Sequence, residues 1–201
     1  MEKIMSSVKN LEFYFDFGSP ASYLAWTQLP KIAEENNANL IMIPMLLGGV
    51  FKATGNNSPA TIASKGKWMN KDLKRHADMY GVKFVLNEFF PINTLYLMRG
   101  ALAAKKLEIF YKYVEGIYLG IWVKNLNLGD TDILKSYLEE LKINSDRLFE
   151  LSQNDEVKNE LIKNTEEAVK RGVFGAPSIF VGEEMHFGQD RLNFVEKALK
   201  L

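Results

Sequence analysis

The feature that most constrains the fold is an aromatic-rich strand that runs directly into the start of a helix. Residues 11–17, LEFYFDF, predict a buried β-strand. Ser19 and Pro20 follow at the N-cap and first helical positions, where both residue types are favoured because the first amides of a helix lack partners within it. A second strand over residues 39–46, NLIMIPML, completes a unit long enough for parallel pairing through a right-handed crossover.

The chain changes character after this unit and returns to strands near its end. Residues 48–66 are interpreted as a loop, and residues 67–171 show mainly helical periodicity. The stretch GAPSIFVGEEMHFG predicts two short strands around a turn at Gly182. A last helix is expected from about Asp190, with Asp190 near its N-cap.

This order of elements predicts an α/β protein with a thioredoxin-like fold that is interrupted by a large all-helical insertion. The expected thioredoxin-like domain consists of residues 1–47 and 173–201, and the expected inserted helical domain consists of residues 48–172. A length of 201 residues suits a small domain that carries such an insertion.

Composition narrows the possible functions. Lys plus Arg and Asp plus Glu each number 25, so the net charge is zero, and we expect no nucleic-acid partner, because such binding needs clustered basic side chains. The sequence has no cysteine and only two histidines, so we predict no disulfide, no thiolate nucleophile and no metal site. No secretory signal and no apolar run of the roughly 18 residues that span a bilayer is found, so we expect a cytoplasmic protein without a membrane partner.

Four stretches carry a resemblance to a known family: FYFDFGSPASYLA, PMLLGGVFKATGNNSP, FPINTLYLMRG and GVFGAPSIFVGEEMHFGQDRL. Together they resemble the 2-hydroxychromene-2-carboxylate isomerases, which are relatives of kappa-class glutathione transferases and, more remotely, of DsbA-type oxidoreductases. The resemblance covers nearly the whole chain in order. It implies the DsbA/kappa-class architecture, glutathione as cofactor, a small aromatic substrate and a homodimer.

Ser19 is the candidate catalytic residue. The first amides of a helix and its dipole favour an anion, and the resemblance places a serine where the redox relatives carry a cysteine. A serine cannot usefully ionise, but its hydroxyl can donate a hydrogen bond to a thiolate that a ligand brings, a contact that contributes about 1.5–3 kcal/mol. The alternative is that Ser19 only caps its helix.

The resemblance also implies glutathione contacts near the C-terminus of the chain. It places a cis peptide bond at Ala176-Pro177, which would let the backbone of Ala176 pair with an extended ligand; an ordinary trans proline is the alternative. Asp190 matches the residue that pairs with the γ-glutamyl ammonium, with helix capping as its alternative role. Gln189 stands where the kappa-class pattern has serine, and its amide is expected to bond the γ-glutamyl carboxylate.

Three further candidates lie between the second strand and the helical region. Asn56 matches a residue near the glutathione thiol, and Lys65 matches one that reaches the glycyl carboxylate; their alternatives are a left-handed turn residue and a solvated loop charge. Asp72 matches a polar position whose family role involves the ligand of the partner subunit. His76 is interpreted as a helix-surface or inter-subunit residue and His186 as a packing residue.

Several aromatic side chains are candidates for a substrate cavity, with core packing as the expected role for most of them. They are Phe89 and Phe90, followed by Pro91, and Tyr111, Tyr118 and Trp122.

Three functional hypotheses follow. The first is a glutathione-dependent isomerase of the 2-hydroxychromene-2-carboxylate type, active in aromatic catabolism, in which a thiolate adds reversibly to an α,β-unsaturated ketone. The second is a kappa-class-like transferase that conjugates electrophiles. The third is a non-catalytic thioredoxin-like binding module. A disulfide oxidoreductase is excluded, because that chemistry needs a protein thiol.

Overall fold

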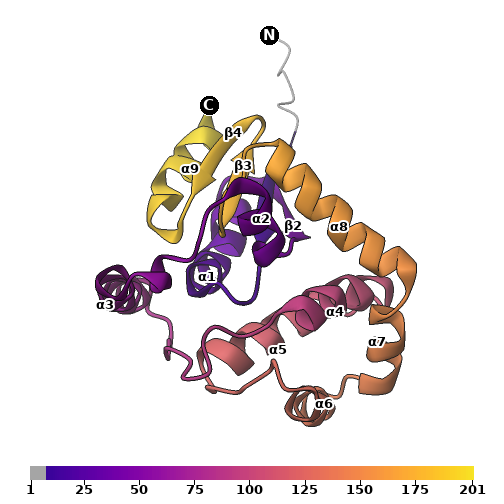
Figure 1. The fold of residues 1–201 in the computed structure, drawn as a ribbon. Helices are drawn as coiled ribbons and strands as arrows, with labels where there is room; N and C mark the ends of the chain where they lie inside the picture. The colour runs from indigo at the N-terminus through magenta and orange to yellow at the C-terminus, as the bar shows by residue number, and fades with distance from the viewer. Residues whose placement is uncertain (1–7) are drawn as a thin grey trace.

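The computed structural model describes residues 8–201, and its elements follow the predicted order (Figure 1). The predicted thioredoxin-like domain begins at residue 1, and its first seven residues lie outside the described part. The helices and strands are β1 (Lys9–Phe15), α1 (Pro20–Glu35), β2 (Ala38–Pro44), α2 (Leu47–Thr54), α3 (Ala63–Tyr80), α4 (Leu95–Lys106), α5 (Phe110–Trp122), α6 (Thr131–Glu140), α7 (Ser145–Ser152), α8 (Asp155–Lys170), β3 (Ser178–Val181), β4 (Glu184–Phe187) and α9 (Leu192–Lys200). Short 3₁₀ turns are formed by Pro59–Thr61 and by Gln189–Arg191.

The four strands form one mixed sheet in the order β2-β1-β3-β4. β1 pairs in parallel with β2, and β3 pairs antiparallel with both β1 and β4. The predicted β-α-β unit and C-terminal strand pair are therefore confirmed. The helices α2 to α8, called the helical segment below, lie between β2 and β3 in sequence, and α4 to α7 gather at one end of the molecule (Figure 1).

Alternation along β1 gives the sheet two apolar faces. Phe13 and Phe15 belong to a large core that includes α1, α4, α5 and α9. Tyr14 points to the opposite face, where it packs in a smaller core with Val50 of α2 and Ala168 of α8. Because neighbouring residues of a strand point to opposite faces, one aromatic strand serves both cores.

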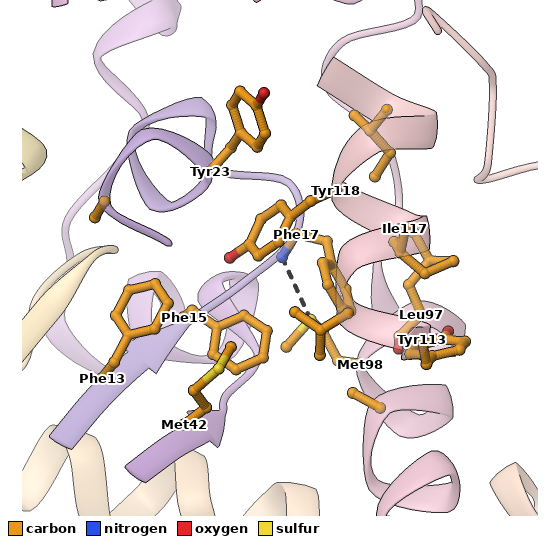
Figure 2. Packing of buried hydrophobic residues seen from close by; sticks show 14 of the residues in the cluster. Phe13, Phe15, Phe17, Tyr23, Met42, Leu97, Met98, Tyr113, Ile117 and Tyr118 are labelled. Carbon is orange, nitrogen blue, oxygen red and sulfur yellow. Dashed lines mark hydrogen bonds between the residues drawn. The ribbon is translucent and has the colours of Figure 1, made fainter. Parts of the chain in front are cut away.

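The helical segment holds the loop that leads into α1. Trp122 of α5 donates from Nε1 to the Phe17 carbonyl at 2.9 Å, and the Phe17 N–H lies 3.4 Å from Met98 Sδ of α4 (Figure 2). The ring centroid of Tyr118 lies 4.9 Å from that of Phe17. The helical segment and the sheet therefore share one continuous core beside Ser19, and the proposed division into two domains remains a prediction.

The structure corrects two predicted boundaries near this loop. β1 ends at Phe15, so Asp16 and Phe17 lie in the connection to α1 rather than in the strand. The interpretation of residues 48–66 as a loop is wrong for most of its length, because α2, a 3₁₀ turn and the start of α3 fall within it. Gly48 and Gly49 lower the local helix propensity, but burial of Val50 holds α2 against the sheet.

Within residues 8–201, no helix combines the length and apolar character needed to cross a bilayer.

Candidate functional site

A cavity of about 760 Å³ opens at the N-terminus of α1. Volumes of this size are typical of sites for small ligands. All eight residues predicted as site residues line it, although they come from distant parts of the chain: Ser19, Asn56, Lys65, Asp72, Ala176, Pro177, Gln189 and Asp190. The structure thus brings the whole set together, while their roles toward a ligand stay predictions.

Ser19 caps α1 as predicted, with Pro20 at the first helical position. Its Oγ accepts a hydrogen bond from the Ser22 N–H at 3.1 Å and donates one to the Ala176 carbonyl at 2.9 Å. The side chain is 5% exposed, so its hydroxyl lies at the floor of the cavity. Ser19 can therefore cap α1 and still contact a second segment at the cavity, because its oxygen accepts the Ser22 N–H while its proton is donated to the Ala176 carbonyl.

The segment before β3 faces Ser19. The Ala176-Pro177 peptide bond is cis, as the resemblance implies. Ala176 is half-buried and its carbonyl accepts the Ser19 hydroxyl. Asn56 of the loop after α2 donates from Nδ2 to the Phe174 carbonyl at 2.8 Å. Two predicted site residues thus contact backbone carbonyls of the same segment before β3, and this segment lines the cavity.

Lys65 and Asp72 both lie on α3. Lys65 is exposed, as its alternative role of a solvated charge requires, but it occupies the first turn of that helix rather than a loop. Asp72 is half-buried, and its Oδ2 lies 3.3 Å from Nδ1 of His76. His76 is a partly exposed residue of the same helix, as predicted for a surface position. The cavity therefore has a cationic and an anionic side chain on one helix.

Gln189 and Asp190 lie in the 3₁₀ turn before α9. Asp190 lies near the start of the last helix, as predicted, but its alternative role as the cap is wrong, because α9 begins at Leu192 with Arg191 at its N-cap. Asp190 is exposed and instead pairs with Nη1 of Arg191 at 2.7 Å. Gln189 is buried, and its carbonyl accepts the Tyr80 hydroxyl of α3 at 2.5 Å. This hydrogen bond therefore joins the 3₁₀ turn to α3 at the residue next to Asp190.

Much of the cavity lining is apolar. Phe90 and Pro91, predicted as cavity candidates, belong to it, whereas Tyr118 and Trp122 are fully buried in the core and Tyr111 is exposed on α5. The cis Phe90-Pro91 bond was not predicted from the sequence. Further apolar residues that line the cavity include Leu47, Phe51, Ile62, Trp68, Met69, Leu73 and Ile92. An aromatic or aliphatic molecule would fit against these side chains.

One polar residue at the floor was not predicted. Asp16 is buried, lines the cavity, and accepts the N–H of Gly18 and the N–H of Leu47, each at 2.8 Å. Burial raises the pKa of its carboxyl group, although those two hydrogen bonds oppose the rise. The available signal was a carboxylate between two phenylalanines at the end of the run LEFYFDF. His186, by contrast, is buried in β4, as its predicted packing role requires.

Comparison with known proteins agrees with this geometry. A family model for the DSBA-like thioredoxin domain matches residues 10–200. The chain is 32% identical to a 2-hydroxychromene-2-carboxylate isomerase of Sphingobium xenophagum over 95% of this chain and 98% of that protein. It is 26% identical to the human glutathione S-transferase kappa 1 over 95% and 91%. A solved 2-hydroxychromene-2-carboxylate isomerase superposes with a TM-score of 0.84 at 26% identity, over 95% of this chain and 94% of that one.

The chain belongs to the DSBA-like thioredoxin domain family, and its fold is the thioredoxin-like fold with a helical insertion. Within that family, the resemblance to 2-hydroxychromene-2-carboxylate isomerases and their kappa-class relatives is confirmed.

Proposed function

We propose that this protein is a glutathione-dependent isomerase of the 2-hydroxychromene-2-carboxylate type. The observation that carries the proposal is the buried Ser19 hydroxyl, which caps α1 and donates to Ala176 beside the cis Ala176-Pro177 bond at the cavity. The proposal includes a cytoplasmic homodimer that acts on a small aromatic substrate in aromatic catabolism. The relatives named as isomerases at about 32% identity support the reaction type.

The groups lining the cavity fit a tripeptide that carries a thiol. The Ser19 hydroxyl and the Ala176 carbonyl now bond each other, and a bound peptide would replace that one bond with two. The hydroxyl proton would turn to the ligand's sulfur, and the carbonyl would accept a backbone N–H, as in strand addition. Asn56, whose Nδ2 now holds the Phe174 carbonyl, would lie near the same sulfur.

The charged residues at the rim would hold the two ends of the tripeptide. Lys65 would bind the glycyl carboxylate, and Asp190 would bind the γ-glutamyl ammonium, which competes with Arg191 for the same carboxylate. Gln189 would bond the γ-glutamyl carboxylate. Asp72 would contact the glutathione that is bound by the partner subunit. These contacts fix the sulfur at the α1 N-terminus, where helix amides favour negative charge.

The chemistry that bound glutathione supplies is addition of its thiolate to the β-carbon of an α,β-unsaturated ketone, rotation about the resulting single bond, and expulsion of the thiolate. The protein's part is to stabilise the thiolate through the Ser19 hydroxyl and the first amides of α1. The apolar lining around Phe90 and Trp68 holds the substrate and excludes water. Glutathione is regenerated, so the reaction consumes none.

A kappa-class-like transferase is the second candidate, and the 26% identity to the human kappa-class transferase over most of both chains favours it. The same residues would bind the thiolate, but the adduct would leave intact. Glutathione consumption separates the two: an isomerase converts substrate at constant glutathione, whereas a transferase removes one glutathione for each electrophile. Sedimentation of the purified protein measures its oligomeric state and so tests the proposed dimer independently of activity.

Ultraviolet absorbance of the bound thiolate, followed during glutathione titrations across pH, tests the proposal. We expect a saturable signal near neutral pH in the wild type, its loss in Ser19→Ala and its retention in Ser19→Thr, which keeps the hydroxyl. Asn144→Ala is the matched control, because Asn144 caps α7 and lies outside the cavity. No binding by the wild type would leave the non-catalytic thioredoxin-like module as the remaining hypothesis.

A further inference from the structure

Asp16 lies where two segments that carry predicted ligand-binding residues leave the sheet. Its Oδ1 accepts the Gly18 N–H in the connection to α1, and its Oδ2 accepts the Leu47 N–H at the start of α2. Its main-chain carbonyl also accepts the Ser19 N–H at 3.0 Å. One buried carboxylate therefore joins two segments that are 31 positions apart in sequence.

Each of these segments carries a predicted glutathione residue. The connection from Asp16 through Gly18 leads directly to Ser19, and α2 leads through the left-handed Gly55 to Asn56. Both residues reach the segment before β3, since Ser19 bonds the Ala176 carbonyl and Asn56 bonds the Phe174 carbonyl. The segments that carry Ser19 and Asn56 are thus joined at one end through this segment and at the other through Asp16.

We propose that Asp16 is a positioning residue of this site, whose carboxylate holds the Ser19 and Asn56 segments at the separation that bound glutathione requires. The inference rests on the proposed function. It assigns to Asp16 a role that acts through Ser19 and Asn56 rather than through contact with the ligand.

A carboxylate fits this position better than the amide of asparagine does. Both oxygens accept backbone N–H groups, whereas asparagine would accept one and turn an NH₂ donor toward the other amide. The groups that face the carboxylate are the amides of Gly18 and Leu47, the Thr94 hydroxyl and, through its charge, the Tyr118 phenol. Of these four groups only the phenol titrates, and burial together with the charge of Asp16 raises its pKa.

If Asp16 acted only through its charge, Asp16→Asn would form more thiolate than the wild type, whereas loss of a positioning residue would give less. A negative charge beneath the helix N-terminus disfavours a thiolate above it, so its removal alone would increase the thiolate population. Loss of the bridge would instead separate Ser19 and Asn56 and reduce both ligand affinity and thiolate formation. The direction of change in one variant therefore distinguishes the two roles.

The first experiment compares Asp16→Asn with Asp130→Asn. Asp130 is a matched control, because its carboxylate also accepts two backbone N–H groups, but at the exposed start of α6. For Asp16→Asn we expect a dissociation constant for S-methylglutathione raised by about ten- to a hundredfold and a weaker thiolate signal with glutathione. Asp130→Asn should change neither by more than about twofold. Unchanged affinity, or a stronger thiolate signal, in Asp16→Asn would overturn the proposal.

A second measurement needs neither glutathione nor the variant. In a pH titration of the wild type followed by nuclear magnetic resonance, the amides of Gly18 and Leu47 should shift with one common midpoint, and the Asn56 side-chain amide should follow them. If Asn56 does not follow, Asp16 does not set its position and the inference is wrong. If the wild type fails to bind glutathione while the three signals move together, the proposed function fails and the structural bridge stands.

Discussion

The helix that begins at Ser19 and the later helices of the helical segment start in different ways. At α6, α7 and α8 the cap residues Asp130, Asn144 and Asn154 are exposed, and each accepts only N–H groups of its own helix. Ser19 is buried, accepts one such N–H, and also donates to Ala176, which is 157 positions away in sequence. The Ser19 hydroxyl therefore joins the start of α1 to the segment before β3, a link that the exposed caps do not make.

The two kinds of helix start also differ in what supports them. The loop before Ser19 is held from the helical segment by Trp122 and Met98, which bond the two backbone groups of Phe17, and toward α2 by Asp16. The exposed caps are instead surrounded by solvent. Substitutions at the supports of Ser19 should therefore disturb the cavity, whereas equal substitutions at the exposed caps should disturb only their helices.

The largest effect is expected from Trp122→Ala. This change leaves a cavity beside Phe84 and Phe90 and removes the donor to the Phe17 carbonyl, so we expect a loss of about 3–5 kcal/mol in the free energy of unfolding. Urea denaturation measures it. The control is Trp68→Ala, because Trp68 is 62% exposed and its loss should cost about 0.5 kcal/mol or less. Equal losses in both variants would contradict the buried support of the loop.

Gly18→Ala should have the next largest effect. A Cβ at Gly18 would lie 3.1 Å from Thr94 Cγ2 and 3.3 Å from Asp16 Oδ1, so the bridge must shift, and we expect a cost of about 1–3 kcal/mol. The matched control is Gly48→Ala, where a Cβ would meet no atom within 4 Å and helix propensity predicts a gain of about 0.5–1 kcal/mol. Thermal unfolding of both variants checks the opposite signs, and two losses of equal size would contradict the expectation.

The start of α1 was the part of the site most open to prediction from the sequence. Ser19 and Pro20 carry their signal locally, because capping depends on neighbours within one turn. The convergence of Asn56, Lys65 and Asp190 on one cavity came from resemblance, since nothing in their local sequence points to a shared ligand. The Asn56 bond to the Phe174 carbonyl, for example, joins segments 118 positions apart in sequence.

The errors also have a physical cause in long-range contacts. α2 was interpreted as loop because Gly48 and Gly49 are poor helix formers, but its first N–H is bound by Asp16 and Val50 is buried against the sheet. Asp190 has the residue type of a cap, yet it pairs with its neighbour Arg191 in a 3₁₀ turn whose Gln189 carbonyl accepts the Tyr80 hydroxyl of α3. In both cases a contact with a distant segment holds the local structure.

The pH dependence of stability should distinguish Asp16 from the exposed acidic cap Asp130. Burial raises the pKa of Asp16, so the folded protein holds that proton at higher pH than the unfolded chain, whose aspartates titrate at about 3.9. The free energy of unfolding should therefore fall as pH rises from the unfolded pKa through the folded one. Asp16→Asn should lack this decline, and Asp130→Asn should retain it. Urea midpoints across acidic pH test this, and a decline of equal size in Asp16→Asn would assign it to another group.

The smallest effect on stability, and the most direct test of the comparison, comes from removing caps. Ser19→Ala and Asn144→Ala each leave one amide of the first turn without its side-chain acceptor, so each should lower the free energy of unfolding by about 1 kcal/mol. The two variants should nevertheless differ completely in the glutathione thiolate signal, because of the two caps only Ser19 lines the cavity and has a hydroxyl that could turn from the Ala176 carbonyl to a bound sulfur. If both variants keep the signal, Ser19 is a cap like the others. If both lose it, the loss follows from stability and not from the hydroxyl.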